Sequence, residues 1–291
     1  MVTFANYAFT IPATLDIILE PYFIFLVIRK SGAGMDSYRF FLFSISICNF
    51  TFSLLVPIWS AEFVFANSTV CAISAHLSSL AEFVVFDVMQ VMGVTIIQLT
   101  LLMLIYASFQ LTHPGKVLCM SLGRRIAIIL AFTQTPVFGL LICNYFILTT
   151  FNCFNVALTP AFCIVCGSLA LYFSSYLALA GYCIKQISGI SKTSHHASSN
   201  TVKLVKSVVK NFVITNSVIV FFVAMPIVVG MLLMLLIGNS LPVMVPQMGF
   251  CFVVFYPLLS TSASILIFTP YRKHTAQLFK DIRCRISVRH D

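Results

Sequence analysis

Lysine and arginine are confined to a few short regions of this 291-residue chain, and four long stretches contain neither residue. These stretches are residues 1–28, 40–115, 126–184 and 211–271. A membrane-crossing helix needs about 20 predominantly apolar residues. The first stretch therefore accommodates one crossing, and each of the other three accommodates a pair of crossings joined by a loop. The pattern predicts seven transmembrane helices.

The composition indicates that lipid, rather than water, surrounds most of the chain. Hydrophobic residues make up 60% of it and charged residues only 9%, against about 25% charged residues in soluble domains. A net charge of +9 can indicate nucleic-acid binding, but the sequence lacks basic patches with interleaved aromatic residues. We therefore expect membrane lipid as a partner and no nucleic acid.

The basic residues also predict the orientation of the chain. Cytoplasmic loops carry an excess of Lys and Arg, and all four basic regions fall on one side of the predicted pattern. The amino terminus is then outside and the carboxyl terminus is cytoplasmic. We expect an all-α, seven-helix transmembrane bundle over residues 1–269 and a basic amphipathic cytoplasmic tail over residues 270–291. The predicted helices are 8–28, 40–65, 77–109, 126–148, 158–184, 208–237 and 246–269.

One cytoplasmic connection has a composition of its own. Residues 188–201 are polar and rich in Ser and Thr. Such a composition is typical of flexible linkers. We therefore expect a flexible inner loop between the fifth and sixth helices.

Two cysteines lie in predicted outer loops. Cys71 follows the second helix and Cys153 follows the fourth, whereas the remaining cysteines fall in membrane or cytoplasmic positions. Because an oxidising compartment permits disulfides, we predict a bridge between these two, with a pair of free thiols as the alternative. Asn67 begins an Asn-Ser-Thr glycosylation sequence on the same face, close to the predicted membrane surface.

Five acidic residues lie inside the predicted helices, where no Lys or Arg is available to pair with them. A charge at the bilayer centre costs about 2.5 to 3.5 kcal/mol on insertion scales, so such groups face the bundle interior, bond to one another or stay protonated. We consider two hypotheses: an outward-facing polar pocket for a small-molecule ligand, or structural hydrogen bonding by protonated acids. The five residues are Asp16, Glu20, Glu62, Glu82 and Asp87.

Basic residues at the inner helix ends are candidates for cytoplasmic coupling or lipid contact. Lys203, Lys206 and Lys210 share one face at the inner end of the sixth helix, where they can meet lipid phosphate or an acidic partner. Arg272 follows the seventh helix. Beyond it the tail combines an apolar side with several basic positions, which predicts an amphipathic helix on the inner leaflet.

Catalytic motifs are missing from the sequence. There is no HExxH pair and no GxSxG turn, and the CxxC spacing at residues 163–166 lies inside an apolar helix without further ligands. We expect no enzyme activity, no catalytic residue, no metal and no cofactor. A seven-helix transporter or cation channel that uses intramembrane carboxylates remains the alternative to a receptor.

Seven helices in this orientation, a bridge between outer loops and an amphipathic tail look like a G-protein-coupled receptor. The sequences MDSYR at residues 35–39 and TPYR at residues 269–272 resemble, more narrowly, the nematode serpentine chemoreceptors of the Str/Srh type. The resemblance implies a receptor for small environmental molecules in the plasma membrane of sensory-neuron cilia. It also implies a heterotrimeric G protein as partner.

Two segments depart from the pattern of rhodopsin-like receptors. The third helix ends in IYASFQ at residues 105–110 and lacks the Arg of the usual acidic-Arg-aromatic motif. The seventh helix has YPLLS at residues 256–260 in place of an Asn-Pro-x-x-Tyr pattern. G-protein coupling is therefore inferred from the architecture and not from a coupling motif.

Overall fold

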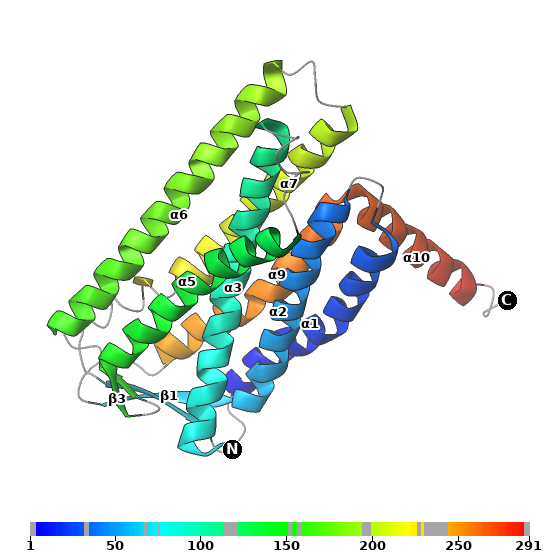
Figure 1. Cartoon of the computed structure of the whole chain (residues 1–291). Helices are drawn as coiled ribbons and strands as arrows, with labels where there is room; N and C mark the ends of the chain where they lie inside the picture. Colours follow the sequence, from blue (N-terminus) through cyan, green and yellow to red (C-terminus); the bar gives the residue numbers. More distant parts are fainter. Residues whose placement is uncertain are drawn as a thin grey trace.

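The chain forms a bundle of long helices with a small β-sheet at one end (Figure 1). The computed structural model describes residues 4–31, 35–66, 69–74, 76–112, 122–150, 153–155, 159–193, 199–225, 228–229 and 244–287. Its helices are α1 (Phe4–Arg29), α2 (Asp36–Trp59), α3 (Ser79–Thr112), α5 (Leu122–Ile147), α6 (Pro160–Thr193), α7 (Ser199–Ile219), α9 (Met244–Ile267) and α10 (Thr269–Ser287). A short π-helix, η1 (Val220–Ala224), continues α7.

Seven helical segments in the described part of the chain are long and apolar enough to cross a membrane. They lie in α1, α2, α3, α5, α6, α7 with η1, and α9. Each spans at least the roughly 18 to 20 residues that a hydrocarbon core of about 30 Å requires. The predicted seven-helix membrane fold is confirmed.

The connections at one end of the bundle add a sheet to this helical fold. Its four antiparallel strands follow the order β1 (Ala61–Ala66), β2 (Thr69–Ser74), β4 (Cys153–Asn155) and β3 (Leu148–Thr150). In Figure 1 the sheet and α10 lie at opposite ends of the bundle. We call these the sheet end and the tail end. Asn67, the predicted glycosylation site, lies outside the described residues.

The predicted second helix, 40–65, is wrong beyond Trp59. The backbone of Ser60 adopts a left-handed conformation with φ of 35°, and its N–H bonds to the carbonyl of Val56, which ends α2. The next segment, Ala61–Ala66, contains Phe63, Val64 and Phe65, aromatic and β-branched residues that pack well on pleated strands. They pair with β2, so Glu62 is an exposed residue of strand β1 and not a residue of a helix.

The predicted loop at 188–201 is also wrong in extent. Residues 188–193 continue α6 and residues 199–201 begin α7, so both helices run a few residues beyond the apolar spans Pro160–Gly189 and Val202–Ala224. A helix of 34 residues such as α6 is about 51 Å long, more than the bilayer core needs. The polar composition of residues 188–201 indicated where the apolar spans end. It did not indicate where the helices end, because helical backbone hydrogen bonds continue into the polar residues.

The core takes residues from α1, α2, α3, α6, α7 and α9. Helix α1 packs against α2 and α9, α3 packs against α2 and α7, and α5 and α6 contact α3 and each other. A large cluster of buried apolar residues extends toward the tail end and includes Leu26, Met103 and Phe268. A smaller one at the sheet end includes Trp59 and reaches Ala72 of β2. The sheet is therefore part of the packed structure.

Tyr271 attaches α10 to the bundle. Its ring is fully buried and makes edge contacts with Phe23, and its hydroxyl lies 2.9 Å from the hydroxyl of Ser31. Burial raises the pKa of Tyr271 above its usual range, so the phenol stays neutral and can hydrogen-bond. A second bond, 2.8 Å between the hydroxyls of Tyr22 and Thr275, fixes the same helix.

Candidate functional site

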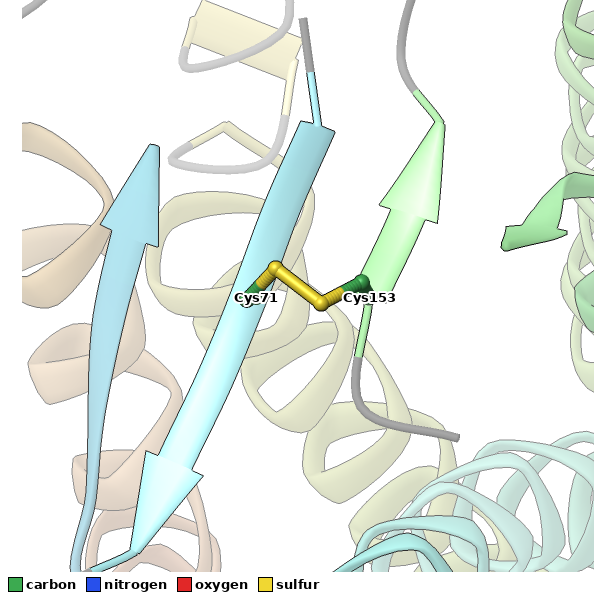
Figure 2. Close-up of a disulfide and its surroundings, with 2 residues drawn as sticks. All are labelled: Cys71 and Cys153. Atoms are coloured by element: carbon green, nitrogen blue, oxygen red, sulfur yellow. A yellow bond between two sulfur atoms is a disulfide. The ribbon is translucent and has the colours of Figure 1, made fainter. Parts of the chain in front are cut away.

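The sheet joins two connections that are far apart in sequence. Strand β2 belongs to the connection between α2 and α3, and β4 to the connection between α5 and α6. Cys71 and Cys153 face each other in the β2–β4 register and form a disulfide across the two strands (Figure 2). These are the two cysteines that the sequence predicts to pair. The disulfide therefore links the α2–α3 connection to the α5–α6 connection covalently at the sheet end.

Glu82, at the start of α3, hydrogen-bonds to the last residue of strand β2. Its side chain is buried, only 3% exposed, and its carboxylate accepts a hydrogen bond from the backbone N–H of Ser74, the last residue of β2. The hydroxyl of Ser74 in turn accepts a bond from the backbone N–H of His76 at 3.3 Å. Glu82 thus has a structural partner in the turn between β2 and α3.

An aromatic cluster lies beneath the sheet. Trp59 at the end of α2 stacks on Phe86 of α3, with ring centroids 5.4 Å apart, and meets Phe250 of α9 edge-on at 5.0 Å. Phe9 of α1 also makes an edge contact with Phe250, with ring centroids 5.3 Å apart. Four transmembrane helices thus meet at this aromatic cluster.

A polar group follows directly after Phe86 on α3. The amide nitrogen of Asn144, in α5, donates to the Gln90 side-chain oxygen at 2.5 Å, and Asn144 also bonds to the carboxylate of Asp87. The second carboxylate oxygen, Oδ1 of Asp87, is buried and accepts no hydrogen bond. We call Asp87, Gln90 and Asn144 the α3 polar group. The Oδ1 atom of Asp87 can accept a hydrogen bond that no donor among the described residues provides.

A second polar cluster joins α1 to α2 and α9. Asp16 and Glu20 lie one turn apart on α1, and both are 0% exposed. The Ser53 hydroxyl of α2 donates to Asp16 at 2.6 Å. The Asn49 amide donates to Glu20 at 2.9 Å.

Two further hydroxyls complete this cluster. Ser46 of α2 and Thr261 of α9 both donate to the carboxylate of Glu20, and the Asn49 amide also reaches the Thr261 hydroxyl at 3.2 Å. We call this set of six residues the α1 acid cluster: Asp16, Glu20, Ser46, Asn49, Ser53 and Thr261.

The five acids considered for one ligand pocket occupy separate surroundings. Asp16 and Glu20 are brought together in the α1 acid cluster, Glu82 bonds to strand β2, and Glu62 is exposed on β1. Among the five, Asp87 directly follows Phe86 of the aromatic cluster in sequence, and its buried Oδ1 accepts no hydrogen bond from the described residues.

Sequence reasoning missed the neutral members of both clusters. Ser46, Asn49 and Ser53 recur at intervals of three and four residues in the largely apolar helix α2. This spacing places them on one helix face, and it was the signal that could have identified them. Gln90 and Asn144 give no such pattern, because their pairing depends on how α3 packs against α5.

At the tail end, neutral hydrogen bonds connect the last turns of α3 to its neighbours. The Tyr38 hydroxyl of α2 donates to the side-chain oxygen of Gln110 at 2.7 Å, and Ser108 donates to Gln186 of α6 at 2.5 Å. Gln110 lies in the segment where rhodopsin-like receptors carry their charged motif. This end of α3 is thus held by uncharged groups.

Tyr38→Phe is expected to destabilise the protein by about 1 to 3 kcal/mol, because Gln110 loses its donor in a largely buried place. Thermal unfolding of the purified chain measures the effect. Tyr106→Phe is the matched control: its ring packs edge-on against Tyr38, but its hydroxyl is not part of this bond. Equal losses in the two variants would contradict a specific role of the Tyr38–Gln110 bond.

The predicted cytoplasmic basic residues are exposed at the tail end. Lys203, Lys206 and Lys210 lie on the outer surface of α7, and Arg272 lies at the start of α10. Further along α10, Leu278 and Phe279 are exposed apolar residues. The tail end therefore offers both basic and apolar side chains to its surroundings.

Seven apolar helices with a disulfide-linked sheet at one end define a multi-pass membrane protein with seven membrane-spanning helices. Residues 141–281, just under half of the chain, match the family described as serpentine type 7TM GPCR chemoreceptor Srh. The match runs from the end of α5 into α10 and confirms the predicted resemblance to serpentine chemoreceptors of the Str/Srh type. None of the curated proteins matches the chain.

Proposed function

We propose that the protein is a chemosensory G-protein-coupled receptor that binds a small environmental molecule. The observation that carries this proposal is the match of residues 141–281 to a serpentine chemoreceptor family within a seven-helix fold. Receptors of this architecture convert ligand binding into a shift between two arrangements of the helices. Small molecule and heterotrimeric G protein are accordingly its proposed partners.

The sheet end faces outward and the tail end faces the cytoplasm in this proposal. A disulfide persists in oxidising compartments, and the Cys71–Cys153 bridge lies at the sheet end. Basic residues, which favour the cytoplasmic side, are exposed at the other end on α7 and α10. The receptor then resides in the plasma membrane, and its resemblance to nematode chemoreceptors suggests the cilia of sensory neurons.

The proposed ligand site is the α3 polar group together with the aromatic cluster beside it. Asp87 Oδ1 can accept a hydrogen bond or a positive charge, and Gln90 and Asn144 keep the carboxylate in place. Phe86, the residue before Asp87 on α3, stacks on Trp59, and the two rings supply apolar surface at the same level of the bundle. Small-molecule sites generally combine apolar walls with a few placed polar groups. We therefore propose a ligand with an apolar body and one hydrogen-bond donor or cationic group.

The proposed coupling surface lies at the tail end. Lys203, Lys206, Lys210 and Arg272 are exposed there and can bind lipid phosphate or acidic side chains of a G protein. Coupling without the usual charged motif would use the neutral contacts of α3, in particular Tyr38 with Gln110. A ligand that favours one helix arrangement would have to change these contacts.

Asp87→Asn is expected to lower ligand potency at least tenfold, since a charge-assisted bond contributes about 1.5 to 3 kcal/mol. The assay is a fluorescent G-protein dissociation reporter in cells that express the receptor, screened with pools of small molecules. Asp281→Asn, the same chemical change on the exposed surface of α10, is the matched control and should keep the response.

Unchanged potency in an Asp87→Asn variant that reaches the surface would move the ligand site elsewhere in the bundle. Absence of any response from the native chain at normal surface level would count against the receptor proposal. Cation flux through the purified chain in liposomes would then favour the transporter or channel alternative.

A further inference from the structure

The two short sequences on which the resemblance to serpentine chemoreceptors rests are connected in the structure. MDSYR, at residues 35–39, enters α2, and TPYR, at residues 269–272, begins α10. Ser31, which shortly precedes the first sequence, is hydrogen-bonded to Tyr271 of the second across a separation of 240 residues. The proposed coupling and ligand sites use neither Arg39 nor Tyr271, so these two residues need an explanation of their own.

Arg39 of α2 caps the carboxyl end of α1. The last four carbonyl groups of a helix have no donor within that helix. Arg39 supplies donors to two of them: its Nε lies 3.2 Å from the carbonyl oxygen of Val27, and its Nη2 lies 2.6 Å from that of Ile28. A positive charge is favourable at this end of a helix as well. One guanidinium group therefore fixes the last turn of α1.

The carbonyl of Val27 leads on to α10. The hydroxyl of Ser31 donates to it at 2.6 Å, so the hydroxyl of Tyr271 is the donor in the 2.9 Å bond to Ser31. The ring of Tyr271 is buried and packs edge-on against Phe23 of α1, and the charge of Arg39 acts on its hydroxyl. A continuous path of hydrogen bonds thus leads from α2 through the end of α1 to α10.

The residue before Arg39 extends this path to α3. Tyr38 donates to the side-chain oxygen of Gln110 at 2.7 Å, and its ring packs edge-on against Tyr106. Tyr38 and Arg39 are consecutive, so the first turn of α2 contacts the end of α3 with one residue and the end of α1 with the next. A shift of this turn would change both contacts together.

We propose that Arg39 is a positioning residue that holds α10 on the bundle, although it belongs to α2 and acts through the end of α1. We call the four residues of the path the tail junction: Arg39, Val27, Ser31 and Tyr271. Without the guanidinium, the last turn of α1 is no longer fixed, and Tyr271 loses a partner of defined position. Because α10 carries Arg272, the consequence for coupling rests on the proposed function, whereas the tail junction itself does not.

Hydrogen exchange of the backbone amides, measured by mass spectrometry on the purified full-length chain in lipid nanodiscs, tests this proposal. In Arg39→Gln the amides of α10 should exchange about tenfold faster than in the native chain, the effect expected when bonds to a charged group are lost. Arg29→Gln, the same change at an exposed position of the α1 end, is the matched control and should keep the native rate. Arg39→Lys keeps the charge but not the forked donor, so it should restore part of the protection.

A second substitution tests whether Arg39 acts through Tyr271. Tyr271→Phe interrupts the tail junction at its other end and should accelerate exchange of α10 by a similar factor. Because both changes interrupt one path, adding Arg39→Gln to Tyr271→Phe should accelerate α10 little further. Two effects that multiply in the double variant would overturn the proposal.

Native exchange of α10 in a folded Arg39→Gln variant would also overturn it. So would an equal acceleration in α6, which is not part of the tail junction, because general destabilisation would then explain the result. If Arg39→Gln does not fold, Arg39→Lys is compared with Arg29→Lys: faster exchange of α10 in the first supports the proposal, and equal rates overturn it. The measurement uses neither ligand nor G protein, so its failure would leave the receptor proposal intact.

Discussion

Replacing Cys71 with Ser should lower the free energy of unfolding by about 4 to 5 kcal/mol. The bridge to Cys153 closes a loop with a sequence separation of 82 residues, and a cross-link over such a distance restricts the unfolded chain by about this amount. The pairing of β2 with β4 rests on the same two residues. Thermal unfolding of the purified protein and antibody detection of the receptor at the cell surface would both report the loss.

Cys163→Ser is the matched control for this change. Cys163 is a free, exposed cysteine on α6, so the same substitution removes no bridge there and should leave the midpoint almost unchanged. A reducing agent should destabilise the native chain as much as the Cys71→Ser substitution does. If reduction and substitution both left the unfolding midpoint at its native value, the Cys71–Cys153 disulfide would have no role in stability.

Trp59→Ala is expected to cost about 3 to 5 kcal/mol, the usual range when a buried large aromatic residue is truncated. Trp59 is only 1% exposed and contacts Phe86 and Phe250 on two other helices. Because Phe86 precedes Asp87, the cavity would also loosen the proposed ligand site. Ligand potency should therefore fall together with the unfolding midpoint.

Phe138→Ala provides the comparison for Trp59→Ala. Phe138 is 63% exposed on α5, so its truncation removes lipid-facing surface and creates no internal cavity. Its midpoint should stay close to that of the native chain. If the Trp59→Ala variant had the same unfolding midpoint as the native chain, the aromatic cluster would not be a packed part of the bundle.

The number of helices could be predicted because it depends on apolar length alone, which is local information. The four-stranded sheet could not, since the sequence indicates the end of an apolar helix at β1 and an outer loop at β2, whereas a left-handed Ser60 ends α2 before both strands. The pairing of β2 with β4 joins two different connections, the one between α2 and α3 and the one between α5 and α6. Only the cysteines gave a sequence signal for it.

The candidate site was predicted in part. Burial of Asp16 and Glu20 could be anticipated from the cost of charge in lipid, and their common helix face follows from the spacing of four. Their partner Thr261 could not, because it comes from α9, a helix far along the chain that the sequence does not place in contact with α1. Uncharged polar residues in apolar helices are common, so their presence alone did not reveal which of them meet.

The bonds of the α1 acid cluster also constrain how the chain is made. When α1 leaves the ribosome, its two acids have no partner, and lipid alone receives them poorly. Their first partners, on α2, follow 26 to 37 residues later, whereas Thr261 follows only after 241 residues. We therefore expect α1 and α2 to leave the translocon together as a hairpin, with α9 joining at the end of synthesis.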